Sequence, residues 1–196
     1  MRNENRPTFN VRDCPATFVT READAGGGRE IACYFAVYNT IYPMWPGESE
    51  TIAPGAFDGC EKRDVRALID HDTRLVLGRT TAGTLILTPD KKGLFGVIKV
   101  NENDSDAMNL YARVQRGDVT QCSFGFDIDQ IAYETQEDGS VLDVIQRVTL
   151  YEVSIVTFPA YEETSAEARS LRDGARQNHR LKRWKEKMKG KLNHGS

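Results

Sequence analysis

One histidine lies outside the C-terminal tail of the chain, and acids flank it in the segment Ile69-Asp70-His71-Asp72. An imidazole titrates near neutral pH, so it is the usual general base of a hydrolase. From this segment alone, two interpretations of His71 stay open. It is either a general base or a structural histidine held by its acidic neighbours, and the elements that surround it must decide.

A serine that could act as a nucleophile lies in the segment Gln121-Cys122-Ser123-Phe124-Gly125-Phe126-Asp127-Ile128. Strand side chains alternate between two faces, so one face, which must point to the core, carries Cys122, Phe124, Phe126 and Ile128. We expect Ser123 on the opposite face, exposed, with room beside the glycine for a peptide. An ordinary serine at the edge of the core is the alternative. Because Cys122 points inward, a cysteine hydrolase is disfavoured.

A carboxylate interrupts the apolar run Leu150-Tyr151-Glu152-Val153-Ser154-Ile155-Val156. Both faces of this run are largely apolar, as in a central strand. Glu152 therefore needs a partner that offsets the loss of its hydration. An imidazole on a neighbouring strand would serve. An arginine would serve as well, and the candidates are Arg66, Arg79 and Arg147.

Other chemistries find little support in the residue pattern. The four cysteines, Cys14, Cys33, Cys60 and Cys122, are widely spaced, which argues against a zinc site and a disulfide framework. We expect reduced thiols, no metal and no cofactor. The chain also lacks the Gly-x-Ser-x-Gly elbow of α/β-hydrolases and a phosphate-binding glycine loop.

Short apolar runs separated by turn residues predict a strand-rich domain. The expected strands are 31–38, 65–69, 84–87, 94–100, 121–128 and 141–158, with hairpin turns at 26–28, 89–93 and 137–139. A helix is predicted to begin at Asp104 or Ser105 and to stop at Gly117, with Ala107, Leu110 and Val114 on its buried face.

Charge is divided unevenly along the 196 residues. The net charge is −3, but residues 169–196 carry ten Lys and Arg against two acids, so the tail is +8 and the rest is −11. The tail composition favours a solvated helix or a segment that orders on binding. No secretion signal or membrane span is recognisable, so we expect the protein in a cytoplasm without membrane contact.

Several segments together resemble the prohead maturation proteases of tailed bacteriophages. The resemblance spans roughly residues 34–161 and rests on the order and spacing of seven motifs. These are Ile52-Ala53-Pro54-Gly55-Ala56-Phe57, Asp64-Val65-Arg66-Ala67-Leu68-Ile69-Asp70-His71-Asp72, Leu77-Gly78-Arg79-Thr80 together with Gly83-Thr84-Leu85, Val114-Gln115-Arg116-Gly117-Asp118-Val119, Ser123-Phe124-Gly125-Phe126, Tyr151-Glu152-Val153-Ser154 and Thr157-Phe158-Pro159-Ala160.

This family is similar in fold to the herpesvirus assemblins. The resemblance implies an α+β fold, a small and mostly antiparallel β-barrel flanked by helices, with residues 1–161 as the protease domain and 162–196 as a basic, helical or partly disordered tail. It implies His71 as the base and Ser123 as the nucleophile. Assemblins place a second histidine on a later strand, and here Glu152 is the natural replacement. Asp70 and Asp72 remain alternatives for this third role.

The resemblance also implies a biological setting. A serine endopeptidase would process scaffold or major capsid protein, and in some cases itself, inside the immature capsid in the host cytoplasm. Because assemblins act as dimers, a homodimer is a further implication. The basic tail would bind acidic scaffold or coat segments, be removed by self-cleavage, or bind nucleic acid. The competing hypothesis is a non-enzymatic assembly factor that uses the tail to bind protein or nucleic acid.

Overall fold

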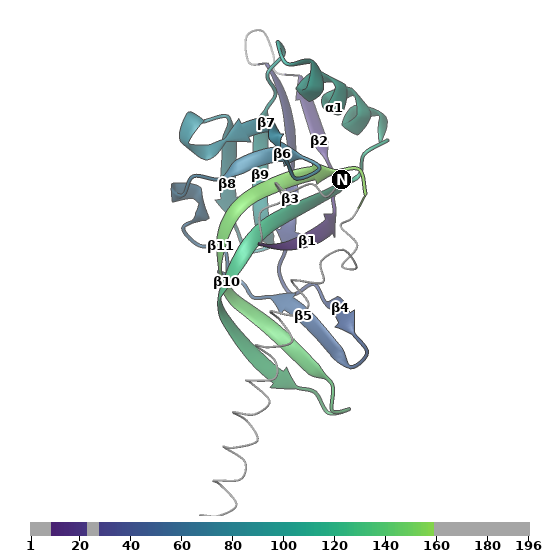
Figure 1. Cartoon of the computed structure of the whole chain (residues 1–196), viewed down its shortest axis with the longest axis vertical. Coiled ribbons are helices and arrows are strands. Elements are labelled where there is room, and N and C mark those ends of the chain that lie inside the picture. Colours follow the sequence, from purple (N-terminus) through teal and green to yellow (C-terminus); the bar gives the residue numbers. More distant parts are fainter. Residues whose placement is uncertain (1–8, 23–27, 159–196) are drawn as a thin grey trace, which may run out of the picture. The chain divides into compact units, whose positions relative to one another are not determined.

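The computed structural model of the chain describes residues 9–22 and 28–158, which form two β-sheets and one α-helix (Figure 1). The larger sheet has the order β1 (Asn10–Pro15), β10 (Gln121–Thr135), β11 (Val141–Val156), β5 (Glu48–Ile52) and β4 (Tyr42–Trp45). It also includes β6 (Arg66–Ile69), which pairs with β11, and β7 (Asp72–Arg79), which pairs with β6. The smaller sheet has the order β2 (Val19–Glu22), β3 (Arg29–Val37), β9 (Gly93–Lys99) and β8 (Leu85–Pro89).

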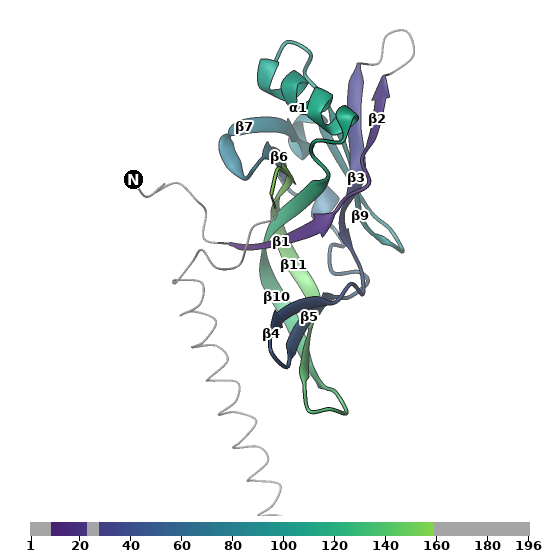
Figure 2. The ribbon, with the colours of Figure 1, turned by 90° about the vertical axis from the view of Figure 1, so that its right-hand side faces the viewer.

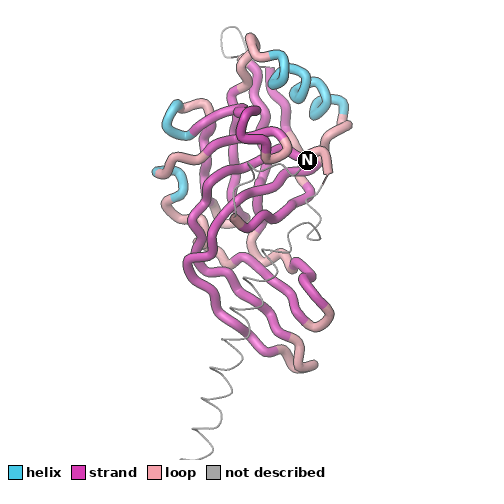
Figure 3. Tube along the Cα trace, in the orientation of Figure 1, coloured by secondary structure: helices cyan, strands magenta, loops and turns pink. Residues whose placement is uncertain are grey.

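The prediction of a closed barrel is wrong. Within the described residues, no strand of the larger sheet pairs with a strand of the smaller one, so the sheets stay separate (Figure 3). The larger sheet branches at β11, which pairs in parallel with β6 along its C-terminal part and with β5 along its N-terminal part. All other strand pairings are antiparallel. A mostly β, α+β-like fold is therefore confirmed, but the described residues have one α-helix in place of several flanking helices and no closed barrel.

The hydrophobic core draws on both sheets. Phe35 and Leu94 of the smaller sheet and Phe124 and Ile155 of the larger one are each at most 1% exposed and belong to one apolar cluster. The prediction that Cys122 and Phe124 face the core is confirmed, because the Cys122 thiol lies 3.3 Å from the main-chain oxygen of Tyr34 on β3. The larger sheet thus presents one face of β10 to the core and the other face away from it.

In the hairpin of β10 and β11, β10 is longer than the predicted strand 121–128, and β11 covers most of the predicted 141–158. The hairpin turns at residues 136–140, where the Gln136 N–H donates to the Ser140 carbonyl (2.9 Å), as expected from the turn residues. Its half near the turn extends away from the core, with β5 and β4 alongside (Figures 1 and 2). The 141–158 segment is one strand, so a single element connects this extension with the core.

The helix α1 (Ser105–Arg116) confirms its prediction closely. The Asp104 carboxylate accepts from the N–H groups of Asp106 and Ala107, and Gly117 ends the helix with a φ of +81°. This positive φ is easy only for glycine. Ala107, Leu110 and Val114 are buried as predicted. No helix in the described part of the chain is long and apolar enough to cross a membrane.

The strands predicted at 31–38, 65–69, 84–87 and 94–100 correspond to β3, β6, β8 and β9. Five strands were not predicted, namely β1, β2, β4, β5 and β7. They are short or rich in charged residues, so neither apolar runs nor strict alternation mark them. The predicted basic tail at 162–196, expected to be helical or partly disordered, lies outside the described residues, as does the predicted turn at Gly26 and Gly27.

Candidate active site

His71 lies in the tight turn that joins β6 to β7. Asp70 and His71 have φ angles of +48° and +59°, so both residues of this two-residue connection are left-handed, as in the common turn of β-hairpins. The Asp70 carboxylate accepts from the Thr157 N–H (2.7 Å) and the Thr157 hydroxyl (3.2 Å). This pair of bonds fastens the turn to the end of β11, and the imidazole is positioned with it.

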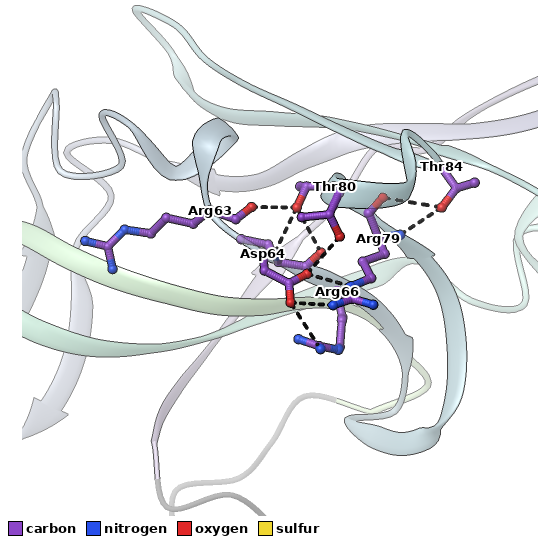
Figure 4. A network of polar contacts seen from close by, with 8 residues as sticks. Arg63, Asp64, Arg66, Arg79, Thr80 and Thr84 are labelled. Carbon is purple, nitrogen blue, oxygen red and sulfur yellow. Dashed lines mark hydrogen bonds and ion pairs between the residues drawn. The ribbon is translucent and has the colours of Figure 1, made fainter.

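The opposite end of the same hairpin is held by a polar network around Asp64 (Figure 4). The Arg79 guanidinium donates to both carboxylate oxygens of Asp64 (2.6 and 2.7 Å), and Arg66 donates to one of them (3.2 Å). The hydrogen bond from Arg79 lowers the pKa of Asp64 to about 2. The Thr80 hydroxyl donates to the carbonyl of Arg63. Both ends of the hairpin are thus fixed by side-chain contacts.

His71 contacts Glu152, which lies on the neighbouring strand β11. The Nδ1 of His71 and the Oε1 of Glu152 are 2.8 Å apart, and only 10% and 4% of the two side chains are exposed. An ionised carboxylate only accepts, so Nδ1–H is the donor and Nε2 of the neutral ring is left as an acceptor. The other carboxylate oxygen, Oε2, accepts from the Ser154 hydroxyl at 2.5 Å. Of the two kinds of partner that the sequence leaves open for Glu152, an imidazole and an arginine, the structure has the imidazole.

Ser123 lies on the same face of the larger sheet as this pair. In the antiparallel register, Ser123 is opposite Ser154 and Gly125 is opposite Glu152. Opposite residues and residues two apart share a face, so Ser123 and Glu152 are diagonal neighbours, whose Cα atoms are typically about 7–8 Å apart. The sheet therefore brings together the three residues that the sequence singled out.

The expectation that Ser123 is exposed is wrong. Its exposed fraction is 0%, and its hydroxyl donates to the main-chain carbonyl of Arg12 on β1 (3.0 Å). The reason is the unpredicted strand β1, which pairs with β10 along the whole segment around the serine. With β11 on its other side, this part of β10 is a central strand rather than an edge.

The room beside Gly125 is occupied rather than open. A Cβ atom at this position would collide with the ring of Phe9 and with Oε1 of Glu152. The Phe9 ring also stacks on Tyr151, with ring centroids 5.5 Å apart. Gly125 therefore admits the carboxylate that contacts His71, while Phe9 fills the space that the sequence predicted for a substrate peptide.

The two polar groups that a serine hydrolase needs to bring together are not bonded to each other. Nε2 of His71 is buried and has no hydrogen-bond partner among the described residues. The hydroxyl of Ser123 is directed to Arg12 instead. The site thus contains an oriented base and a nearby hydroxyl, and a rotation of the serine side chain is the smallest change that would turn the hydroxyl away from Arg12.

The other candidates for the third role have different partners. Asp70 binds Thr157, and Asp72 binds Arg74, whose hydrogen bonds lower the pKa of Asp72 to about 2. Of the three arginines that were alternative partners of Glu152, Arg66 and Arg79 both contact Asp64. The third, Arg147, lies on β11 itself, opposite Gln130 of β10.

Cys122 is fully buried, and its pKa is raised by the neighbouring thiol of Cys33 and by burial, which outweigh the opposing hydrogen bond from Cys14. This thiol is an unsuitable nucleophile. No group of three or more His, Cys, Asp or Glu in the described part of the chain could hold a metal ion.

Sequence reasoning missed three parts of the site: Ser154, Phe9 and the carbonyl of Arg12. Ser154 could have been found, since it is two residues from Glu152 and therefore on the same face of a strand. Phe9 and the carbonyl of Arg12 could not have been found, because the sequence does not mark β1 as a strand. Every residue has a main-chain carbonyl, so the sequence does not single out that of Arg12.

Comparison with known proteins agrees with the resemblance. A family model described as caudovirus prohead serine protease matches residues 16–178, which include His71, Ser123 and Glu152. The prohead protease of Enterobacteria phage HK97 is 29% identical over 154 residues, which make up 76% of this chain and 66% of that protein. The chain thus spans just under two thirds of this relative's length. No solved structure matches the chain.

Proposed function

Since this chain belongs to the caudovirus prohead serine protease family, we propose that it is a serine endopeptidase that cleaves capsid proteins during maturation of a phage prohead. The roles are those of nucleophile for Ser123, general base for His71 and orienting carboxylate for Glu152. The observation that carries this proposal is the buried contact between His71 and Glu152, on the sheet face that also carries Ser123.

The reaction would use these residues in two stages. Nε2 of His71 takes the proton of Ser123 as Oγ bonds to the peptide carbonyl carbon. The imidazolium then gives this proton to the leaving amine as the C–N bond breaks, which leaves an ester on Ser123. In the second stage, water gives a proton to His71 and attacks the ester, and the serine regains its proton. Glu152 stabilises the imidazolium in both stages.

This chemistry requires a rearrangement on the serine side. The hydroxyl must leave the carbonyl of Arg12 and turn toward Nε2 of His71, and a substrate must reach a residue that is 0% exposed. Catalytic hydrogen bonds often tighten only when substrate binds, so the missing bond does not conflict with the role. The covering elements, β1 and Phe9, must yield for a peptide to enter.

The proposed substrates are the major capsid protein, a scaffold protein or both, and the chain itself is a further candidate. The proposed location is the interior of the prohead in the host cytoplasm. The tail at 162–196 is proposed to direct the protein there through its positive charge. Whether it binds protein or nucleic acid separates two versions of this proposal, and binding to each at rising salt would discriminate them.

The test is co-expression with the coat and scaffold proteins of the same phage. Ser123→Ala and His71→Ala should each abolish processing while circular dichroism and the unfolding midpoint show a folded protein. Cys122→Ala is the matched control, because it changes the adjacent residue on the opposite face and should keep processing. Undiminished processing by either of the first two variants would refute the proposal.

The burial of Ser123 favours a second candidate, a non-enzymatic assembly factor. A fluorophosphonate probe distinguishes the two, because it attaches covalently only to an activated serine hydroxyl. We expect labelling of the Ser123 peptide, lost in His71→Ala. If mature protein assembled in proheads stays unlabelled and coat protein stays uncleaved, the assembly factor is the better description.

A further inference from the structure

The carboxylate of Glu152 uses its two oxygens for two different partners. Oε1 accepts from Nδ1–H of His71 (2.8 Å), and Oε2 accepts from the hydroxyl of Ser154 (2.5 Å). The Ser154 bond is in the short range of hydrogen bonds to an ionised oxygen, which are about twice as strong as neutral ones. Ser154 is thus a direct hydrogen-bond partner of the Glu152 carboxylate, which in turn contacts the imidazole of His71.

Water cannot readily replace this hydroxyl. Ser154 is 0% exposed and Glu152 is 3% exposed, so the carboxylate depends on protein groups for its hydrogen bonds. A buried polar group that loses its partner pays the full cost of its desolvation. Removing the hydroxyl of Ser154 would therefore leave Oε2 without a replacement in the same position.

The backbone of β11 fixes the distance between the two residues. Ser154 and Glu152 are two residues apart and point to the same face. β11 is paired at this point on both sides, with Ser123 of β10 opposite Ser154 and with Leu68 of β6 beside it. Neither side chain can be moved by a local shift of the strand without breaking these pairings.

Gly125 restricts the position of the Glu152 carboxylate from the side of β10. It is opposite Glu152 in the register, and a Cβ atom there would collide with Oε1. The carboxylate therefore sits against the backbone of β10, with Ser154 on one oxygen and His71 on the other. A glutamate side chain has several rotatable bonds, and these contacts select one arrangement.

We infer that Ser154 is a positioning residue, whose hydroxyl holds the Glu152 carboxylate in the orientation that keeps Nδ1–H of His71 bonded and Nε2 directed to the reaction. This inference rests on the proposed function of the site. Ser154 touches neither the base nor the substrate in this role, and it acts through Glu152. Its hydroxyl proton is already donated to a carboxylate, which distinguishes it from Ser123 directly opposite.

The first test compares Ser154→Ala with the unchanged protein in cleavage of a coat-derived peptide. We expect kcat to fall about 10- to 100-fold with KM changed less than about 3-fold, because the lost bond supports the base rather than substrate binding. Ser154→Thr, which keeps a hydroxyl, should recover most of kcat. Thr51→Val is the matched control, since it removes a buried hydroxyl on β5 that has no hydrogen-bond partner among the described residues.

The second measurement does not depend on activity. In the Ser123→Ala background, the Nδ1 proton of His71 should give a downfield NMR signal because it is bonded to a carboxylate. Adding Ser154→Ala should shift or broaden this signal, whereas adding Thr51→Val should not. If Ser154→Ala does not fold, Ser154→Cys, with a similar volume and a weaker donor, provides the same comparison.

The outcomes separate this inference from the proposed function. An unchanged kcat and an unchanged proton signal in Ser154→Ala would overturn the positioning role and leave the protease intact. Full cleavage by Ser123→Ala would overturn the proposed function itself. Fluorophosphonate labelling of Ser154 in place of Ser123 would overturn both assignments, because Ser154 would then be the nucleophile.

Discussion

The two halves of the candidate site differ in how far they are assembled. On the imidazole side, His71, Glu152 and Ser154 form a continuous chain of hydrogen bonds, and the turn that carries His71 is fastened by Asp70 to Thr157. On the serine side, the Ser123 hydroxyl is bound to a carbonyl of another strand. The imidazole side has the hydrogen bonds that the proposed mechanism needs, whereas the serine hydroxyl is bonded elsewhere.

The element responsible for this difference is β1. It supplies the carbonyl that binds Ser123, and it is anchored by a buried ion pair in which Arg12 contacts Glu50 on β5 (2.5 and 2.8 Å). Both side chains of this pair are about 5% exposed. Removing one partner of a buried ion pair strongly destabilises the fold. The Arg12–Glu50 pair therefore holds β1 firmly in the larger sheet beside β10. The comparison teaches that the proposed base is held by contacts within the sheet, whereas the proposed nucleophile is bonded to the N-terminal strand.

The largest effect should come from the imidazole side. Glu152→Gln keeps the shape of the side chain but weakens the support of the imidazolium, and we expect kcat to fall by on the order of 10³- to 10⁴-fold. Peptide cleavage and the urea midpoint measure activity and folding separately. Glu134→Gln, an exposed glutamate on β10, is the matched control. A larger loss in Asp70→Asn than in Glu152→Gln would move the orienting role to the turn.

A smaller effect is expected where the two halves meet. Gly125→Ala introduces a Cβ against both Phe9 and Oε1 of Glu152, so it should destabilise the fold by about 1–3 kcal/mol and lower kcat. Urea denaturation and peptide cleavage are the measurements. Combining it with Phe9→Ala should recover part of the stability but not the orientation of Glu152. Full recovery of kcat in the double variant would show that only the aromatic ring matters.

On the serine side, removing the Phe9 side chain should make Ser123 more accessible to a reagent. Phe9→Ala takes away the ring that lies against Gly125, and we expect fluorophosphonate labelling of Ser123 to become faster by on the order of 3- to 10-fold. Labelling rates followed by intact-protein mass spectrometry provide the measurement. Phe158→Ala, a highly exposed aromatic residue, is the control. A labelling rate equal to that of the unchanged protein would remove Phe9 from the covering elements.

The smallest effect is expected from the cysteines. All four thiols are free and buried, and burial raises the pKa of Cys60 to about 12, so at pH 8 only roughly one such thiol in 10⁴ is ionised. The folded protein should react slowly with a thiol reagent and keep its activity, and reaction should become rapid after unfolding. Rapid loss of activity from the folded state would reopen a cysteine mechanism.

Residue types and strand parity predicted much of the imidazole side. The oddity of a carboxylate in an apolar strand pointed to Glu152, and its need for a partner left an imidazole and an arginine open. The family resemblance then favoured His71. Parity also separated Ser123 from Cys122, because alternation is a local property of any strand. Apart from the resemblance, each of these inferences uses only the residue types and the alternation within a single segment.

The serine side could not be predicted in the same way. Its burial depends on β1, a six-residue strand with a polar alternation too weak to recognise, which pairs with residues more than 100 positions away. The branching of the larger sheet likewise depends on β11 changing its partner from β5 to β6. Such pairings are decided by the whole chain, and no local pattern encodes them.

The long hairpin that brings Glu152 to His71 has a consequence for how the protein is made. The two residues are 81 positions apart, and β11, which carries Glu152, is the last strand among the described residues. Contacts of such sequence separation carry a large loop-closure cost and form late in folding. During synthesis His71 and Ser123 emerge before Glu152, so a growing chain lacks the contact between His71 and Glu152 until β11 is complete. In the proposed protease, the order of translation would thus withhold the orienting carboxylate from incomplete chains.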